Sequence, residues 1–184
     1  MRTDPGFTEL RTTALRLRRS LPGDAEAISA YRSDPDVHVH QGWHKTDPDH
    51  VRGEIEQMLR RVPGEPGGWV QFTLETLDGG DLVGDVGLCL DRQDPDVVLV
   101  GYTVAPAHQG HGYATEAIGA LVGYAFDTLE ADVVRAYADA GNVASVRVAA
   151  KVGLQVVERF EESDADGTWH GVRMERRRPA RQDR

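Results

Sequence analysis

The sequence predicts an α+β domain with a mixed, mostly antiparallel central sheet of about seven strands, flanked by four helices. The first observation is the order of elements: one strand, two helices, three strands, a helix, a strand, a helix and two strands. This order fits neither the regular alternation of a doubly wound fold nor an all-β sandwich. The second observation is two turn sequences, at residues 78–80 and 93–96, which join the three consecutive strands as antiparallel neighbours.

The first strand and the first two helices are predicted from periodicity and capping residues. Residues 14–19 alternate apolar and basic side chains, which is typical of a strand with one buried face. Asp24 fits the N-cap of a helix that ends before residues 34–36. A second helix begins at Asp47-Pro48, and its apolar stripe consists of Val51, Ile55, Met58, Leu59 and Val62.

The remaining elements follow from the same two signals. Apolar residues recur at helical spacing over residues 113–128, and a shorter helix over residues 143–151 ends at Gly153. Runs bounded by turn residues predict the strands 69–76, 81–91, 97–104, 133–138, 154–161 and 169–177.

A chain of 184 residues suits a single domain with one hydrophobic core. We therefore expect a single domain at residues 13–178, with flexible tails at 1–12 and 179–184.

Composition limits the partners and the compartment. A net charge of -9 opposes general nucleic-acid binding, and the basic cluster of Arg173 and residues 176–178 is interpreted as a solvated strand end. No apolar run could span a bilayer and the N-terminus lacks a secretory signal, so we expect no membrane partner. The single cysteine, Cys89, favours a reducing, cytoplasmic location. A homodimer is compatible with the sequence.

The most informative segment joins the predicted strand 97–104 to the following helix. It reads Gln109-Gly110-His111-Gly112-Tyr113-Ala114. Two glycines let the backbone approach a ligand, and N–H groups that converge at a helix N-terminus favour phosphate. A dinucleotide-binding fingerprint would need Gly or Ala where Thr115 stands, and a Walker loop would need Lys after the last glycine. Both alternatives fit poorly.

This segment matches the Q-x-x-G-x-A pyrophosphate loop of the GNAT acetyltransferase superfamily. Residues 112–117, Gly-Tyr-Ala-Thr-Glu-Ala, resemble its ribosomal-protein N-terminal acetyltransferase branch. A second patch, with Asn142, Ser145 and the sequence Lys-Val-Gly-Leu at residues 151–154, is similar to positions of the same branch. The resemblance implies a GNAT-like fold and acetyl-CoA as the acyl donor.

The resemblance also implies roles for individual residues. The amides of residues 110–114 would hold the CoA pyrophosphate, Gln109 would order the loop, and Val104 would contact the thioester carbonyl where its strand diverges from the next. Asn142 would reach the pantetheine or the diphosphate, although N-capping explains it equally well. Ser145 would lie near the leaving sulfur. The implied cofactor-binding set is Val104, Gln109, Gly110, His111, Gly112, Tyr113, Ala114, Asn142 and Ser145.

The catalytic residues are less clear because the chain departs from the family twice. Leu99 stands where the branch often has a glutamate base, and Ala149 stands where many members have a tyrosine acid. The catalytic candidates are Ser145 and Asp85, a carboxylate within a predicted strand whose alternative interpretation is a solvent-facing residue. His40, itself a second candidate base, and Trp43 are expected to line the acceptor pocket. The spacing of the histidines does not indicate a metal site.

The predicted function is therefore an N-acetyltransferase. It would move an acetyl group from acetyl-CoA to a primary amine, either a peptide N-terminus or a small amine, by direct attack. The alternative is a catalytically weak acyl-CoA-binding sensor or interaction module that keeps the cofactor loop.

Overall fold

The computed structural model describes residues 1–41, 45–164 and 167–180. Its strands form one sheet in the order β1-β2-β3-β4-β5-β6-β8-β7. They are β1 (Glu9–Arg11), β2 (Leu15–Arg19), β3 (Val70–Thr76), β4 (Leu82–Leu90), β5 (Val97–Val104), β6 (Val133–Asp139), β7 (Gln155–Asp164) and β8 (Gly167–Arg177). The helices are α1 (Ala25–Arg32), α2 (Pro35–His38), α3 (Pro48–Leu59), α4 (Tyr113–Asp127) and α5 (Val143–Lys151), with 3-10 turns η1 (Pro22–Asp24) and η2 (Pro106–His108).

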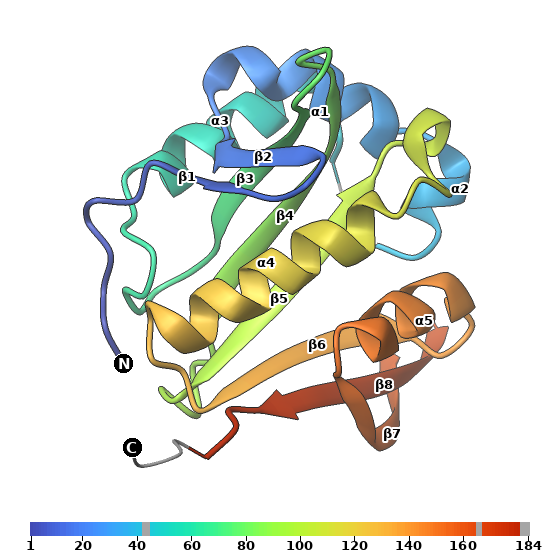
Figure 1. The fold of residues 1–184 in the computed structure, drawn as a ribbon. Helices are drawn as coiled ribbons and strands as arrows, with labels where there is room; N and C mark the ends of the chain where they lie inside the picture. Colours follow the sequence, from blue (N-terminus) through green and yellow to red (C-terminus); the bar gives the residue numbers. More distant parts are fainter. Residues whose placement is uncertain (42–44, 165–166, 181–184) are drawn as a thin grey trace.

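The sheet is antiparallel except at one pair of strands. β5 and β6 are parallel, and α4 connects them by crossing one face of the sheet (Figure 1). This topology confirms the predicted α+β class with a mixed, mostly antiparallel sheet. The described sheet has eight strands rather than about seven, and α2 is an additional helix. Three residues in β1 and four in α2 are too few to give a periodic signal.

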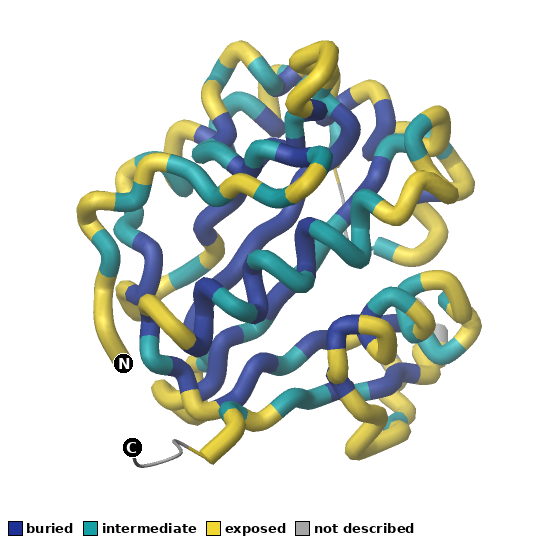
Figure 2. The backbone as a smooth tube through the Cα atoms, viewed as in Figure 1, coloured by how far each residue is buried: buried dark blue, intermediate teal, exposed yellow. Residues whose placement is uncertain are grey.

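Apolar side chains cover both faces of the sheet. Phe72 and Val86 belong to the larger cluster, together with Ile118 and Leu121 of α4. On the opposite face, α1 and α3 form a smaller cluster of Ala25, Ile28, Tyr31, Val51 and Ile55. Figure 2 shows the buried positions running along the central strands and along the inward side of α4. The two helical layers therefore leave the ends of the central strands as the places where a site can open.

Part of the N-terminal segment that we expected to be a tail packs against the domain. Residues 9–11 form β1, antiparallel to β2. The ring centroid of Phe7 lies 4.8 Å from that of Phe72 and 5.4 Å from that of Tyr124. The Tyr124 hydroxyl donates to Asp4 Oδ2 at 2.9 Å. Packing thus begins before residue 13. Residues 181–184 of the expected C-terminal tail lie outside the described residues.

The C-terminal basic cluster also contacts the domain, which corrects its interpretation as a solvated strand end. Arg176 Nη1 donates to the carbonyl of Val152 at 2.9 Å, and its guanidinium lies 5.6 Å from the ring centroid of Phe126. Arg178 Nε donates to the carbonyl of Ala131 at 2.8 Å. These contacts attach the end of the chain to α4 and to the segments that flank α4 and α5. Sequence proximity alone could not predict them.

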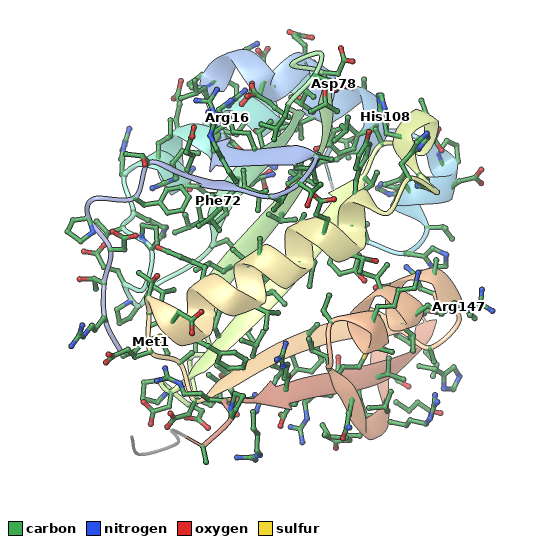
Figure 3. The ribbon with its side chains drawn as sticks, in the orientation of Figure 1. Met1, Arg16, Phe72, Asp78, His108 and Arg147 are labelled. Carbon is green, nitrogen blue, oxygen red and sulfur yellow. The ribbon has the colours of Figure 1, made fainter. Side chains whose placement is uncertain are left out.

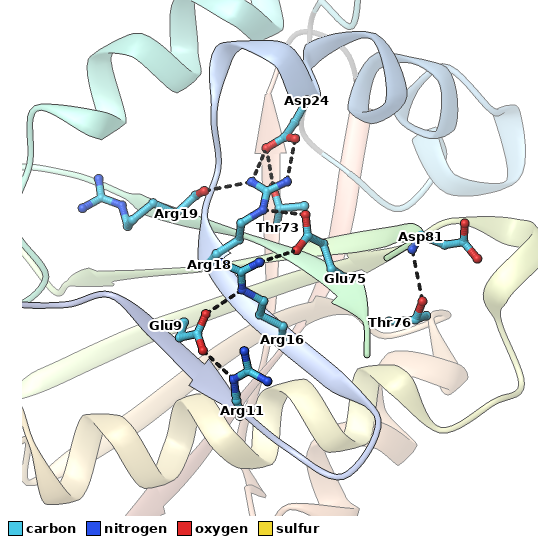
Figure 4. Close-up of polar contacts among 10 residues, drawn as sticks. All are labelled: Glu9, Arg11, Arg16, Arg18, Arg19, Asp24, Thr73, Glu75, Thr76 and Asp81. Carbon is cyan, nitrogen blue, oxygen red and sulfur yellow. Dashed lines mark hydrogen bonds and ion pairs between the residues drawn. The ribbon is translucent and has the colours of Figure 1, made fainter. Parts of the chain in front are cut away.

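A network of charged side chains fixes the start of α1 to the sheet (Figure 4). Arg18 donates from Nη1 and Nη2 to the two carboxylate oxygens of Asp24, at 2.7 and 2.8 Å. Its Nε donates to Glu75 Oε1 at 2.6 Å. The side chains of Arg18 and Asp24 are only 16% and 11% exposed. Because the pair is largely buried, losing one partner leaves the other poorly solvated.

Arg18→Met is therefore expected to lower the free energy of unfolding by about 2 to 3 kcal/mol, measured by urea denaturation. Burial raises the pKa of Asp24, but hydrogen bonds, above all from Arg18, outweigh it, so the pKa is lowered below 3.8. A lowered carboxylate pKa contributes stability that is present above the unfolded value and lost as the pH falls through the folded value. The effect of the substitution should accordingly shrink as the pH falls below 3.8.

The matched control is Arg52→Met. Arg52 pairs with Asp49, whose side chain is 92% exposed. An exposed pair of this kind contributes less than about 1 kcal/mol, so the control should unfold at nearly the same urea concentration as the wild type. Equal unfolding free energies for the Arg18 and Arg52 variants would contradict the role of the network.

Candidate functional site

The end of β5 lies beside an opening in the sheet. β5 pairs with β4 as far as Val104, whereas its described pairing with β6 runs only from Val97 to Leu99. Beyond this point the two strands diverge (Figure 1). Ala105 donates its N–H to the carbonyl of Val83 in β4 at 2.9 Å. Because N–H directions alternate along a strand, the N–H of Val104 is directed into the opening. The predicted divergence of this strand from the next is confirmed.

The loop before α4 places two glycines in the left-handed conformation. The φ angle is 81° at Gly110 and 85° at Gly112, which is the N-cap of α4. No heavy atom lies within 4 Å of the position that a Cβ would take at either residue. The first N–H groups of a helix lack intrahelical acceptors, and the helix dipole makes this end positive. The loop can therefore hold a diphosphate against an open backbone surface.

Two side chains hold the conformation of this loop. Gln109 Nε2 donates to the carbonyl of Val104 at 3.1 Å, which agrees with its predicted ordering role. His111 Nδ1 lies 2.9 Å from the carbonyl of Gln109, and its ring stacks on Tyr113 with centroids 5.6 Å apart. The loop is thus tied both to the end of β5 and to the first residue of α4.

Helix α5 borders the opening on the β6 side, and its first turn is capped. Asn142 Oδ1 accepts the N–H of Ser145 at 3.0 Å. This contact confirms the capping interpretation of Asn142. Its contact with the cofactor stays a prediction.

A cavity of about 490 Å³ lies in this opening. It is lined by α2, by the last residues of β5, by the loop and first turn of α4, and by α5. In Figure 3, the turn with His108 and the helix with Arg147 lie on its two sides. All the predicted cofactor-binding residues line it except His111. His40 of the predicted acceptor pocket lines it too, whereas Trp43 lies outside the described residues.

Tyr102 is a residue of the site that sequence reasoning missed. Its hydroxyl lies 2.7 Å from Ser145 Oγ and donates to the Ser145 carbonyl at 2.8 Å. Burial raises the pKa of Tyr102 to about 12, although the hydrogen bond with Ser145 lowers it in part. Tyr102 therefore keeps its proton throughout the physiological range. The only sequence signal for Tyr102 is its place after Gly101 in the predicted strand. That signal does not identify Ser145 as its contact.

Asp85 lies in a different environment from the cavity. It is 6% exposed, so the interpretation as a solvent-facing residue is wrong. Its carboxylate accepts from the hydroxyl of Tyr31, from Gln71 Nε2 at 2.7 Å and from Arg32 Nη2 at 3.5 Å. Burial, followed by the charge of Asp85, raises the pKa of Tyr31 well above its ordinary value.

The contacts of Asp85 connect α1 to β3 and β4. Among the described residues that line the cavity, Asp85 is not included, although its neighbour across the strands, Thr103, is. The arrangement favours a structural role, and the catalytic role of Asp85 stays a prediction. The solvent-facing interpretation is wrong because α1 covers the face of β4 from which the Asp85 side chain extends.

The open loop at the N-terminus of α4, the diverging strands and the cavity between them suit an extended ligand that carries phosphate. The acetyltransferase (GNAT) domain family matches residues 14–155. The chain belongs to the GNAT acetyltransferase family. It is an acetyl-CoA-dependent N-acyltransferase, and its acceptor is an amine.

Relatives and solved structures agree with this assignment. The uncharacterized N-acetyltransferase YoaA of Bacillus subtilis is 30% identical over 149 residues, which cover 81% of this chain and 84% of the relative. A GNAT-family acetyltransferase of Bacillus anthracis has a TM-score of 0.79 at 20% identity, covering 92% of this chain and 98% of its own. The ribosomal L7/L12 alpha-N-protein acetyltransferase RimL, solved with coenzyme A, has a TM-score of 0.78 at 13% identity, with 92% and 97% covered. At these identities the structures show the shared fold.

Among the helices of the described residues, none is both long enough and apolar enough to cross a membrane.

Proposed function

We propose that this enzyme transfers the acetyl group of acetyl-CoA directly to a primary amine, either a peptide N-terminus or a small amine. The observation that carries the proposal is the cavity that joins the glycine loop, the diverging end of β5 and Ser145. One end of this cavity suits a diphosphate and the other suits a thioester. An acceptor could enter from the α2 side, where His40 lines the wall.

The parts of the donor would be held by different elements. Amides of the loop before α4 would bind the diphosphate. The backbone of β5 beyond Leu99, which β6 does not pair, would bond the amides of the pantetheine arm. The N–H of Val104 would polarise the thioester carbonyl by donating a hydrogen bond to its oxygen. Together these contacts would place the carbonyl carbon beside the acceptor.

The reaction would need one proton removed and one supplied. The amine nitrogen would attack the carbonyl carbon, the C–S bond would break, and the amine would lose a proton while the leaving thiolate gains one. Ser145, on the cavity wall, is our candidate for stabilising the thiolate. Ala149 offers no hydroxyl for this purpose and is 1% exposed.

The side chain at position 99 favours one class of amine. Leu99 stands where the ribosomal-protein branch often has a glutamate base, and leucine cannot remove a proton. An acceptor amine that is already partly neutral therefore has an advantage. An α-amino group has a pKa of about 7.7 to 8.0, against about 10.4 for a lysine side chain. Near pH 7.5 the neutral fraction of the α-amine is roughly 200- to 300-fold larger. We therefore propose that α-amines are acetylated faster than lysine-type amines.

The test is thiol release from acetyl-CoA with a panel of amines, with the product identified by mass spectrometry. The panel pairs a peptide that has a free N-terminus and no lysine with an N-terminally blocked peptide that contains one lysine, and adds small amines. We expect release with the free N-terminus or with a small amine, and slower release with the lysine peptide. Acetyl-CoA binding without release for any amine would favour the sensor function instead.

A further inference from the structure

A hydroxyl contact connects β5 to α5 across the opening of the sheet. The Tyr102 hydroxyl of β5 lies 2.7 Å from Ser145 Oγ and 2.8 Å from the Ser145 carbonyl oxygen, so its one proton can go to either acceptor. The strand pairing that would hold this end of β5 to β6 stops at Leu99. Within the part of the chain that the structure describes, no other hydrogen bond joins β5 to α5. Tyr102 and Ser145 both line the cavity.

The two hydroxyls share a limited number of protons. Each hydroxyl has one proton to donate and can accept from others. When the Tyr102 hydroxyl donates to Ser145 Oγ, the proton of Ser145 is free to point into the cavity. When Tyr102 donates to the carbonyl instead, Ser145 can donate back to the phenol oxygen. The direction of the Ser145 proton therefore depends on Tyr102.

We infer that Tyr102 is a positioning residue for the leaving group: by donating to Ser145 Oγ, its hydroxyl holds the first turn of α5 on β5 and leaves the Ser145 proton free to point toward the thiolate. The inference rests on the proposed function. Net proton donation by Tyr102 itself is disfavoured, because burial raises its pKa to about 12. A free thiol has a pKa of about 8.5, so the phenol would hold its proton in preference to the thiolate.

The test is a set of four proteins: wild type, Tyr102→Phe, Ser145→Ala and the double variant. In the wild-type background, Tyr102→Phe is expected to lower kcat about tenfold, with a change in the KM for acetyl-CoA of less than about threefold. In the Ser145→Ala background the same substitution should change kcat by less than about twofold. The control is Tyr137→Phe, because Tyr137 is 46% exposed and lies outside the residues that line the cavity. Its kcat should equal that of the wild type.

Two results would overturn the inference. One is an unchanged kcat in Tyr102→Phe, and the other is an equal loss in both backgrounds, which would mean that Tyr102 acts independently of Ser145. A wild-type enzyme that acetylates no amine would instead refute the proposed function. In that case the unfolding free energies of the same four proteins still test the contact, because strictly additive changes would show that the two side chains do not interact.

Discussion

Gly112→Trp is expected to abolish measurable acetyl-CoA binding in calorimetric titration. Gly112 has a φ of 85°, in the left-handed region that disfavours any side chain by about 1 to 2 kcal/mol. The larger effect is steric. The space beside its backbone is open to 4 Å, and we propose that the diphosphate occupies it. An indole there would keep phosphate oxygens from the amides at the start of α4, and the loss of several charge-assisted hydrogen bonds should exceed a 100-fold change in affinity.

Gly80→Trp is the matched control for this experiment. Gly80 lies in the turn between β3 and β4, has a φ of 73°, and also has no heavy atom within 4 Å of its Cβ position. The substitution therefore introduces the same backbone strain and the same side chain away from the cavity. We expect the control to bind acetyl-CoA with wild-type affinity. Wild-type affinity in Gly112→Trp as well would remove the loop before α4 from the binding site.

Features of the fold that depend on local chemistry could be predicted from the sequence. The strand Val97–Val104 and the helix Val143–Lys151 have the predicted bounds. Turn residues, caps and periodicity lie within a few residues of the elements that they define, so a single sequence contains the whole signal. The same is true of the glycine loop, because tolerance of a positive φ is a property of glycine itself.

Features that depend on contacts between distant segments could not be predicted. Tyr102 and Ser145 are 43 residues apart, and no pattern in either segment names the other. Asp85 illustrates a second limit. Alternation with Val86 and Leu88 correctly places Asp85 on the opposite face of β4, but alternation does not tell whether a helix covers that face. Here α1 covers it and brings Tyr31 and Arg32 to the carboxylate.

Asp85→Asn is expected to lower the free energy of unfolding by about 3 kcal/mol, measured by urea denaturation. The carboxylate accepts from Tyr31, Gln71 and Arg32. An amide has only one acceptor oxygen and adds an NH₂ donor. This NH₂ group would therefore face the donor groups of the cluster without an acceptor between them. Acetyl-CoA affinity should be unchanged, since Asp85 is absent from the described lining of the cavity. Asp78→Asn, at an exposed carboxylate in the turn before β4, should leave stability unchanged.

Comparing stability with turnover in Asp85→Asn separates the two roles of this carboxylate. Unfolding free energy is measured without substrates, so it reports only the contacts that attach α1 to β3 and β4. If the structural role is correct, stability falls, and a second substitution that stabilises the domain elsewhere should restore kcat at the assay temperature. If Asp85 is the base that the sequence suggested, kcat falls more than about tenfold even in a variant of wild-type stability. That result would make Asp85 the base, and the proton of the amine would then cross from the cavity wall at Thr103 to Asp85 on the paired strand.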